Sequence, residues 1–294
     1  MPRVVLVLAF LALSLTMIGC DDDKVTDSYY IEPDHAYMQD AWPKWSPTDT
    51  SLVAYTHIAV TWEEHLEFGD YTTWIVDLET AKTRYVTSGI IADWSPDGSH
   101  VIVHSSVPGI VLVNVETGDE EMLPIRGYTP DFSPCGTMIA FDNSEDPIGV
   151  TIYNLETQET RWICSQGEPD WSPDGSKLLC FIMEMYDTAG NFLGTIPYDQ
   201  QYGYGWHARW SPDGRLVTYG AYCESKKKSV GIWVINPDGT GQQLVACPGA
   251  VPSWSPDGRR IAYGARSADG RAMVIWVVNA DGTDPTQVTF PYKP

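Results

Sequence analysis

Trp171-Ser172-Pro173-Asp174-Gly175 is one copy of a motif that occurs six times along the chain. Each copy has an aromatic residue followed by Ser-Pro, and Asp-Gly completes four of the six copies. Pro fixes φ at the second position of a tight turn, Asp accepts hydrogen bonds from nearby amides, and Gly adopts the left-handed conformation. The motif therefore predicts a turn that joins two β-strands. The six aromatic residues, which we call the motif aromatics, are Trp45, Trp94, Phe132, Trp171, Trp210 and Trp254.

A strand-like segment follows every copy, with bounds of 52–57, 101–106, 138–143, 178–183, 216–221 and 261–266. Nine or ten residues after the motif aromatic, each segment carries a ring side chain: Tyr55, His104, Phe141, Phe181, Tyr219 or Tyr263. His104 occupies the same slot as five aromatic rings, so we interpret it as a core histidine and not as a metal ligand.

A second hairpin follows most of these segments, for example at 113–118 and 234–239. Each repeat therefore encodes about four antiparallel strands. The motif aromatics are 49, 38, 39, 39 and 44 residues apart. Four-stranded sheets that recur at about 40 residues are typical of propeller blades. The sequence predicts an all-β, six-bladed β-propeller over residues 42–294, with a distorted fourth blade because 191–204 lacks the expected hairpin.

The repeats resemble the PD40 repeats of the TolB-like propeller superfamily, and the resemblance covers residues 42–290. It differs from WD40 repeats, because no Gly-His to Trp-Asp pairing recurs. The resemblance implies the fold and leaves the function open.

The first residues have the pattern of an export signal. Arg3 precedes an apolar run over 4–18, and Gly19-Cys20 resembles the lipobox of bacterial lipoproteins, although Met17 departs from its usual Leu. We predict a signal peptide at 1–19, a lipidated Cys20, and a linker at 20–41. The alternative is an ordinary cleaved signal in which Cys20 is incidental. The predicted location is the bacterial cell envelope, at the periplasmic face or the cell surface.

The chain carries 18 Lys and Arg against 39 Asp and Glu, a formal charge of −21. Nucleic acid is excluded as a partner, because phosphate binding needs a basic face. Direct docking on anionic lipid is disfavoured for the same reason, so membrane contact is expected through the lipid anchor only. An envelope protein or a carbohydrate is the expected partner of a monomeric propeller.

Five cysteines remain after Cys20: Cys135, Cys164, Cys180, Cys223 and Cys247. Their odd number predicts at least one free thiol, and no C-x-x-C pair suggests a zinc site. Export would permit a disulfide, for which Cys223 with Cys247 is the first choice from the repeat register.

In antiparallel blades the first and third turns lie on one face, and the second turns and inter-blade links lie on the other. We call these the turn face and the variable face. Loop length varies on the variable face, at 58–71, 187–191, 197–207 and 222–230. Binding residues concentrate on such loops. The predicted partner-binding residues are Trp62, Glu63, Glu64, His65, Tyr71, Tyr202, Tyr204, Trp206 and His207. The alternative is that these loops pack on themselves and only their charges face solvent.

The residue directly before each motif aromatic should face the central channel. These ring residues are Lys44, Asp93, Asp131, Asp170, Arg209 and Ser253. The carboxylates of Asp93, Asp131 and Asp170 suit a hydrated cation such as calcium. Alternatively, they bond neighbouring backbone amides or pair with Arg209 and Lys44. No other cofactor is predicted.

No G-x-S-x-G elbow, H-E-x-x-H pair or phosphate loop occurs in the sequence. We therefore expect a non-catalytic propeller that mediates protein or ligand binding. A metal-dependent polysaccharide lyase is the enzymatic alternative, in which His57, His65 and His207 would converge. A purely structural envelope protein is the other alternative.

Overall fold

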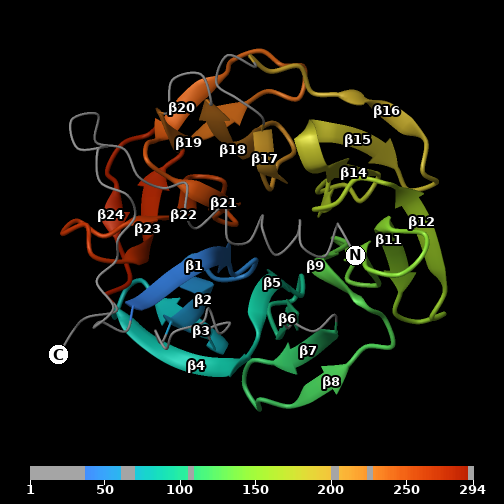
Figure 1. The fold of residues 1–294 in the computed structure, drawn as a ribbon, viewed down its shortest axis with the longest axis horizontal. Coiled ribbons are helices and arrows are strands. Elements are labelled where there is room, and N and C mark those ends of the chain that lie inside the picture. Colours follow the sequence, from blue (N-terminus) through green and yellow to red (C-terminus); the bar gives the residue numbers. More distant parts are fainter. Residues whose placement is uncertain (1–36, 61–69, 105–108, 200–204, 224–227, 291–294) are drawn as a thin grey trace, which may run out of the picture.

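The computed structural model describes residues 37–60, 70–104, 109–199, 205–223 and 228–290, which form six four-stranded antiparallel sheets arranged in a ring (Figure 1). The first three sheets are β1 (Tyr37–Trp45), β2 (Leu52–Val60), β3 (Asp70–Asp77), β4 (Lys82–Ser88); β5 (Ile90–Trp94), β6 (His100–His104), β7 (Ile110–Asn114), β8 (Glu120–Met122); and β9 (Gly127–Phe132), β10 (Met138–Asn143), β11 (Gly149–Asn154), β12 (Thr160–Cys164). The other three are β13 (Asp170–Trp171), β14 (Lys177–Cys180), β15 (Glu184–Asp187), β16 (Phe192–Thr195); β17 (Gly205–Trp210), β18 (Val217–Cys223), β19 (Lys228–Ile235), β20 (Gln243–Ala246); and β21 (Ala250–Trp254), β22 (Arg260–Arg266), β23 (Met273–Asn279), β24 (Thr286–Gln287).

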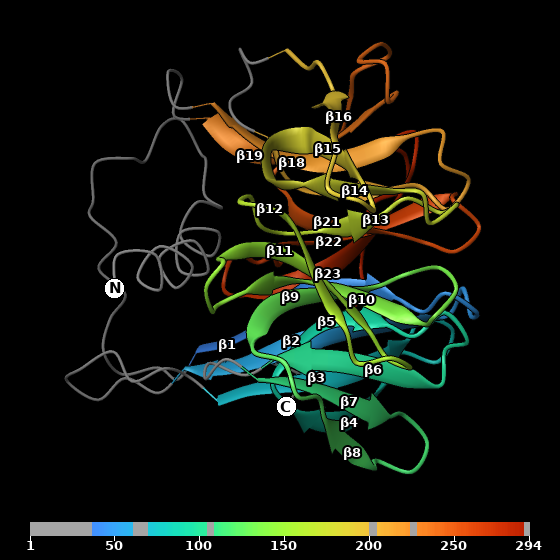
Figure 2. The same ribbon diagram turned by 90° about the vertical axis from the view of Figure 1, so that its right-hand side faces the viewer.

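Each sheet is one blade of a propeller. The first strand of every blade lies nearest the centre of the ring and the fourth lies at the periphery (Figure 1), and a view from the side shows the blades around one axis (Figure 2). The predicted all-β, six-bladed fold is therefore confirmed. Strand β1 begins at Tyr37, before the predicted propeller boundary at residue 42. Residues 1–36 lie outside the described residues, so the signal peptide and the lipidated Cys20 stay predictions.

The repeated motif forms the first turn of each blade. In the second blade, the Ser95 hydroxyl donates to the Asp97 carboxylate over 2.6 Å, and the Gly98 amide donates to the Ser95 carbonyl over 2.8 Å. Gly98 has a φ of 72°, which a side chain disfavours. The hydroxyl also accepts from the His100 amide over 2.9 Å, so one serine connects both ends of the turn. This local network explains why the motif recurs at the same place in the blades.

The hydrophobic core lies between adjacent blades. Five motif aromatics are buried, and Trp210 is half-buried. The aromatic position nine or ten residues after the motif aromatic is buried as expected where the blades are regular. His104, which occupies it in the second blade, is 4% exposed and lies edge-on against Tyr128, with ring centroids 5.7 Å apart. Among the residues described, no helix is long and apolar enough to cross a membrane.

The fourth blade is distorted, but not where the sequence suggested. The strand expected at 178–183 stops at Cys180, and a single 3-10 turn, η1 (Phe181–Met183), leads directly into β15. The third turn therefore comes early, at 187–191, where Asp187 accepts hydrogen bonds from the Ala189 and Asn191 amides. Placing 187–191 on the variable face was wrong, because a shortened second connection moves this hairpin onto the turn face.

The ring closes by contact between the first and last blades. Trp45, Val53 and Tyr55 pack against Ala262 and Ile275 in one buried cluster. The Arg260 guanidinium lies 4.8 Å from the centre of the Trp45 ring and donates to the Thr50 carbonyl over 2.8 Å. Both end blades are built from consecutive strands of the described chain. The added strand suggested for 29–32 lies outside the described residues.

Candidate functional site

Five of the six innermost strands are interrupted by β-bulges close to the channel. The ladder register shifts between Ala41 and Lys44, between Ile91 and Asp93, and at equivalent points of β9, β17 and β21. A bulge turns a side chain away from the regular alternation and is common beside binding sites. The residues three positions before the motif aromatics, which we call the bulge residues, are Trp42, Ile91, Thr129, Glu168, His207 and Val251.

Five of the six bulge residues have left-handed backbone, with φ between 47° and 55°. Ile91 is the exception. This region is unfavourable for residues other than glycine, and most of all for the β-branched Thr129 and Val251. The cost is of the order of 1–3 kcal/mol for each residue, and such strain concentrates at functional sites. The backbone outliers therefore direct attention to the surface that these side chains form.

All six bulge residues line one cavity of about 270 Å³, which we call the channel-mouth cavity. Its other walls come from second turns and inter-blade links, including Ser144, Gly167 and Phe181. The cavity therefore lies on the variable face. Apolar surface dominates its lining, with contributions from Ile90, Tyr128 and Ile148, although polar residues also reach it. A concave apolar site with a few polar groups is typical of ligand recognition.

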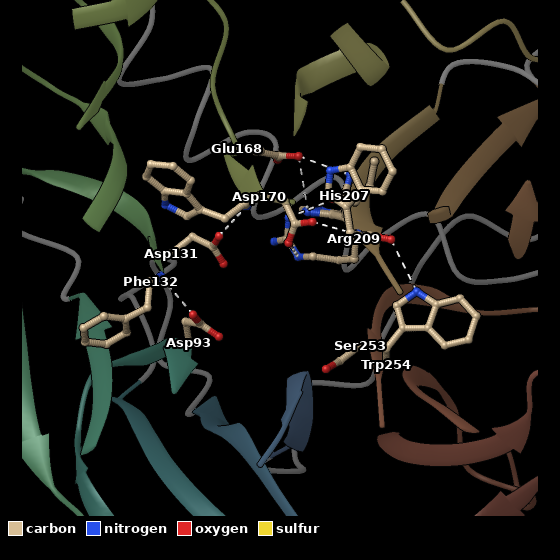
Figure 3. Close-up of polar contacts among 12 residues, drawn as sticks. Asp93, Asp131, Phe132, Glu168, Asp170, His207, Arg209, Ser253 and Trp254 are labelled. Atoms are coloured by element: carbon tan, nitrogen blue, oxygen red, sulfur yellow. Dashed lines mark hydrogen bonds and ion pairs between the residues drawn. The ribbon is translucent and has the colours of Figure 1, made fainter. Parts of the chain in front are cut away.

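His207 and Glu168 supply part of the polar wall (Figure 3). The His207 Nδ1 lies 3.4 Å from the Glu168 Oε2, which also accepts a hydrogen bond from the His207 amide over 3.2 Å. Burial lowers the pKa of His207, and this effect outweighs the opposing charge of Glu168. The imidazole is therefore neutral near pH 7.

The ring residues form hydrogen bonds between neighbouring blades (Figure 3). The carboxylates of Asp93, Asp131 and Asp170 accept from the amides of Phe132, Trp171 and Trp210, over 3.0, 2.8 and 2.7 Å. The Ser253 hydroxyl accepts from the Trp45 amide over 3.0 Å, which joins the last blade to the first.

The side chains of Lys44 and Arg209 cannot accept a hydrogen bond. At these two positions the backbone carbonyl is the acceptor instead. The indole Nε1 of Trp94 donates to the Lys44 carbonyl over 3.0 Å, and that of Trp254 donates to the Arg209 carbonyl over 3.3 Å. Each of the six blade interfaces thus has one hydrogen bond at the ring position. This arrangement accommodates both the four acceptor side chains and the two cationic residues at the ring position.

Burial raises the pKa of all three ring carboxyls, and it raises that of Asp170 to about 6. The charges of Asp93 and Asp170 add to the rise at Asp131. Arg209 opposes the rise at Asp170, since its Nε lies 3.7 Å from the Asp170 carboxylate. The channel therefore holds buried ionisable groups that influence one another's pKa.

The structure gives the predicted cation site no ligand cluster. Among the residues that the structure describes, no three His, Cys, Asp or Glu side chains form a group that could hold a metal ion. The three aspartates bond the backbone instead, which is the alternative that the sequence left open. His57 and His207 have different carboxylate partners, because the His57 Nδ1 lies 2.7 Å from the Asp40 carboxylate while His207 faces Glu168.

Three of the predicted partner-binding residues are described. His207 lines the channel-mouth cavity. Tyr71 and Trp206 are half-buried and pack against the cluster that contains Trp42, so they support the cavity wall. The remaining six, which lie outside the described residues, are Trp62, Glu63, Glu64, His65, Tyr202 and Tyr204.

Sequence reasoning missed five of the six bulge residues. The available signal was their variety: the motif aromatic is Trp in five of the six repeats, whereas three residues upstream the side chains are Trp, Ile, Thr, Glu, His and Val. Diversity at one register position of a regular frame indicates a position that is free to carry specificity.

No protein-family model and no curated protein matches the sequence. Among solved structures, TolB from Acinetobacter baumannii superposes with a TM-score of 0.63 at 18% sequence identity, over 94% of this chain and 66% of that chain. By fold, this chain is similar to TolB.

Solved structures with other names also superpose on this chain. The oligogalacturonate lyase from Vibrio parahaemolyticus has a TM-score of 0.55 at 15% identity, over 87% of this chain and 79% of that chain. The β-propeller domain of the Trilobed protease from Pyrococcus furiosus, described as having an open velcro topology, has a TM-score of 0.59 at 14% identity over 90% of this chain and 98% of that chain. Likeness at such identity establishes the fold and leaves the function to the site.

Proposed function

We propose that this TolB-like propeller is a non-catalytic binding module of the bacterial cell envelope, anchored by a lipid on Cys20, that binds a partner at the channel-mouth cavity. The observation that carries the proposal is the convergence of all six bulge residues on that cavity. Five of them hold unfavourable backbone conformations. A fold that needed only stability would place glycine at those positions.

The cavity favours a protein segment over a sugar. Its volume of about 270 Å³ suits one or two side chains of a partner. A sugar would present hydroxyl groups that each need a polar partner, whereas the exposed Ile148 and the half-buried Phe181 offer apolar surface. Buried aromatic and aliphatic contacts of this kind carry most of the affinity in protein interfaces.

Two carboxylates of the channel already accept hydrogen bonds from the backbone. Asp131 accepts from the Trp171 amide, and Glu168 accepts from the His207 amide. A general acid or base must instead be within reach of substrate, and catalytic carboxylates act in pairs across the scissile bond. These engagements support a binding role for the channel.

A binding assay with paired variants tests this proposal. Thr129→Arg would fill the cavity from one bulge position, while Thr117→Arg places the same change on an exposed third turn of the turn face. We expect Thr129→Arg to abolish co-purification of the partner from membrane extracts and Thr117→Arg to preserve it. Equal retention by both variants would contradict the site.

Two further assays test the other parts of the proposal. Metabolic labelling with an alkyne fatty acid should mark the full chain and not Cys20→Ala. Incubation with uronate-rich polysaccharides, with and without manganese, should give no unsaturated products. Cleavage that Thr129→Arg removes would replace the binding role by a lyase.

A further inference from the structure

Cys164 and Cys180 are brought together across the boundary between the third and fourth blades. Cys164 ends β12, the outermost strand of its blade, and Cys180 ends β14, the second strand of the next. Their Sγ atoms lie 3.5 Å apart, and both side chains are buried. The pair sits in one apolar cluster with Ile163, Trp171 and Leu178.

This boundary joins the regular third blade to the least regular blade of the ring. Strand β13 has two residues and β14 has four, and η1 replaces the continuation of β14. The equivalent strand of the fifth blade, β18, has seven residues. Short strands leave fewer ladder hydrogen bonds to hold the fourth blade in place. A covalent link at this boundary would compensate for the shorter ladders.

We propose that Cys164 and Cys180 form a disulfide that ties the third blade to the fourth in the exported protein. The inference rests on the export that forms part of the proposed function, since an oxidising compartment is needed for the bond to persist. Closing the contact from 3.5 Å to the ~2.05 Å of a disulfide needs a movement of the order of a side-chain adjustment. The link would close a loop between positions 16 residues apart.

The bond forms by two exchanges with a disulfide oxidant, such as an envelope thiol oxidase or oxidised glutathione. The Cys164 thiolate attacks one sulfur of the oxidant, which gives a mixed disulfide and releases the first thiol. The Cys180 thiolate then attacks the Cys164 sulfur and releases the second thiol. Two electrons pass to the oxidant, and the two protons lost by the cysteines end on its thiols. The contact between the two thiols lowers the pKa of Cys164 and raises that of Cys180, so Cys164 is the thiol suited to the first attack.

The link would also fix one wall of the channel-mouth cavity. Ser165 and Gln166 follow Cys164 directly, Phe181 follows Cys180, and all three line the cavity. The Phe181 amide donates to the Gly167 carbonyl over 2.8 Å, so the two segments are already joined by their backbones. Glu168, the partner of His207, lies at the end of the first segment. The disulfide therefore preorganises a wall that contacts the partner.

Thiol mapping tests the inference directly. The full chain with its leader is expressed in a bacterial host, denatured, and alkylated with N-ethylmaleimide before and after reduction. Trypsin cleaves after Lys177, so the disulfide would join peptide 162–177 to peptide 178–209. We expect this linked pair before reduction, with alkylation of Cys164 and Cys180 only after reduction. The exposed Cys135 should be alkylated in both samples and serves as the internal control.

A second arm separates this inference from export. The purified full chain is refolded in a mixture of oxidised and reduced glutathione, where the linked peptides should form regardless of where the cell places the protein. Linked peptides in glutathione but not in cells would indicate failed export and leave the disulfide supported. Free alkylation of both cysteines in the glutathione arm would overturn the inference. Reduction should also lower the Tm of the wild type by several degrees more than that of Cys164→Ala/Cys180→Ala, and equal decreases would contradict a stabilising link.

Discussion

Trp171 gives the sharpest test of how the blades hold together. Its side chain is 5% exposed and packs in the apolar cluster between the third and fourth blades. The hydrogen bond from its backbone amide to the Asp131 carboxylate would remain in Trp171→Ala. The indole Nε1 is buried and makes no hydrogen bond among the described residues, so the loss is one of apolar contact and cavity formation. A buried Trp→Ala change costs about 3–5 kcal/mol. At about 2–4 °C per kcal/mol for a domain of this size, the Tm should fall by roughly 6–20 °C.

Trp162 provides the matched control. It lies on β12 of the third blade and is 44% exposed. Trp162→Ala should lower the free energy of unfolding by much less than Trp171→Ala, by about 1 kcal/mol, because nearly half of the Trp162 surface is already in water. Urea unfolding followed by circular dichroism measures both variants. Equal losses for Trp171→Ala and Trp162→Ala would refute the idea that indoles between blades stabilise the ring.

Three other changes test the channel. The pKa of Asp170 is raised from 3.8 to about 6, so its contribution to stability is complete below about pH 4 and is lost as pH rises to about 6. The loss amounts to about 3 kcal/mol. The urea midpoint should therefore depend less on pH in Asp170→Asn than in the wild type, and an unchanged pH dependence would contradict the shift. Ser253→Ala leaves the Trp45 amide without its acceptor and should cost about 1–3 kcal/mol of unfolding free energy, so a neutral result would remove this bond from ring closure. Thr129→Gly should raise the Tm slightly. Glycine relieves about 1–2 kcal/mol of left-handed backbone strain and costs about 0.5–1 kcal/mol through the greater entropy of the unfolded chain. A marked decrease in Tm would show that the backbone at Thr129 is not strained.

The fold was predictable because its signal is local and repeated. Ser95, Asp97 and Gly98 determine their turn through bonds within a few residues, and the other copies repeat the pattern. The distortion of the fourth blade was predicted, but its position was not. In the sequence, Phe181 occupies the aromatic position ten residues after the motif aromatic, yet in the structure it begins η1 and lines the cavity. A shortened connection cannot be distinguished from a missing hairpin when only residue types are known.

The site was less predictable, because it depends on contacts between repeats. The two functions weighed for the ring aspartates, a cation site and backbone bonds, differ only in whether the next blade's amide is close enough. None of the bulge residues is a glycine, so the sequence does not indicate their left-handed backbone. Their shared orientation follows only from the strand register. The cysteine pair shows the same limit. Repeat register favoured Cys223 with Cys247, and Cys223's side chain lies outside the described residues, whereas Cys164 and Cys180 meet through blade stacking.

Site-specific photocrosslinking in cells tests the central claim most directly. Ile148 is 45% exposed and lies at the channel-mouth cavity, while Glu156 is exposed in the third turn of the same blade, on the turn face. With p-benzoylphenylalanine at each position in turn, we predict an ultraviolet-dependent adduct with an envelope protein from position 148 and none from position 156. The adduct should disappear when Thr129→Arg fills the cavity. An adduct from position 156 alone, or one that survives Thr129→Arg, would contradict binding at the channel mouth.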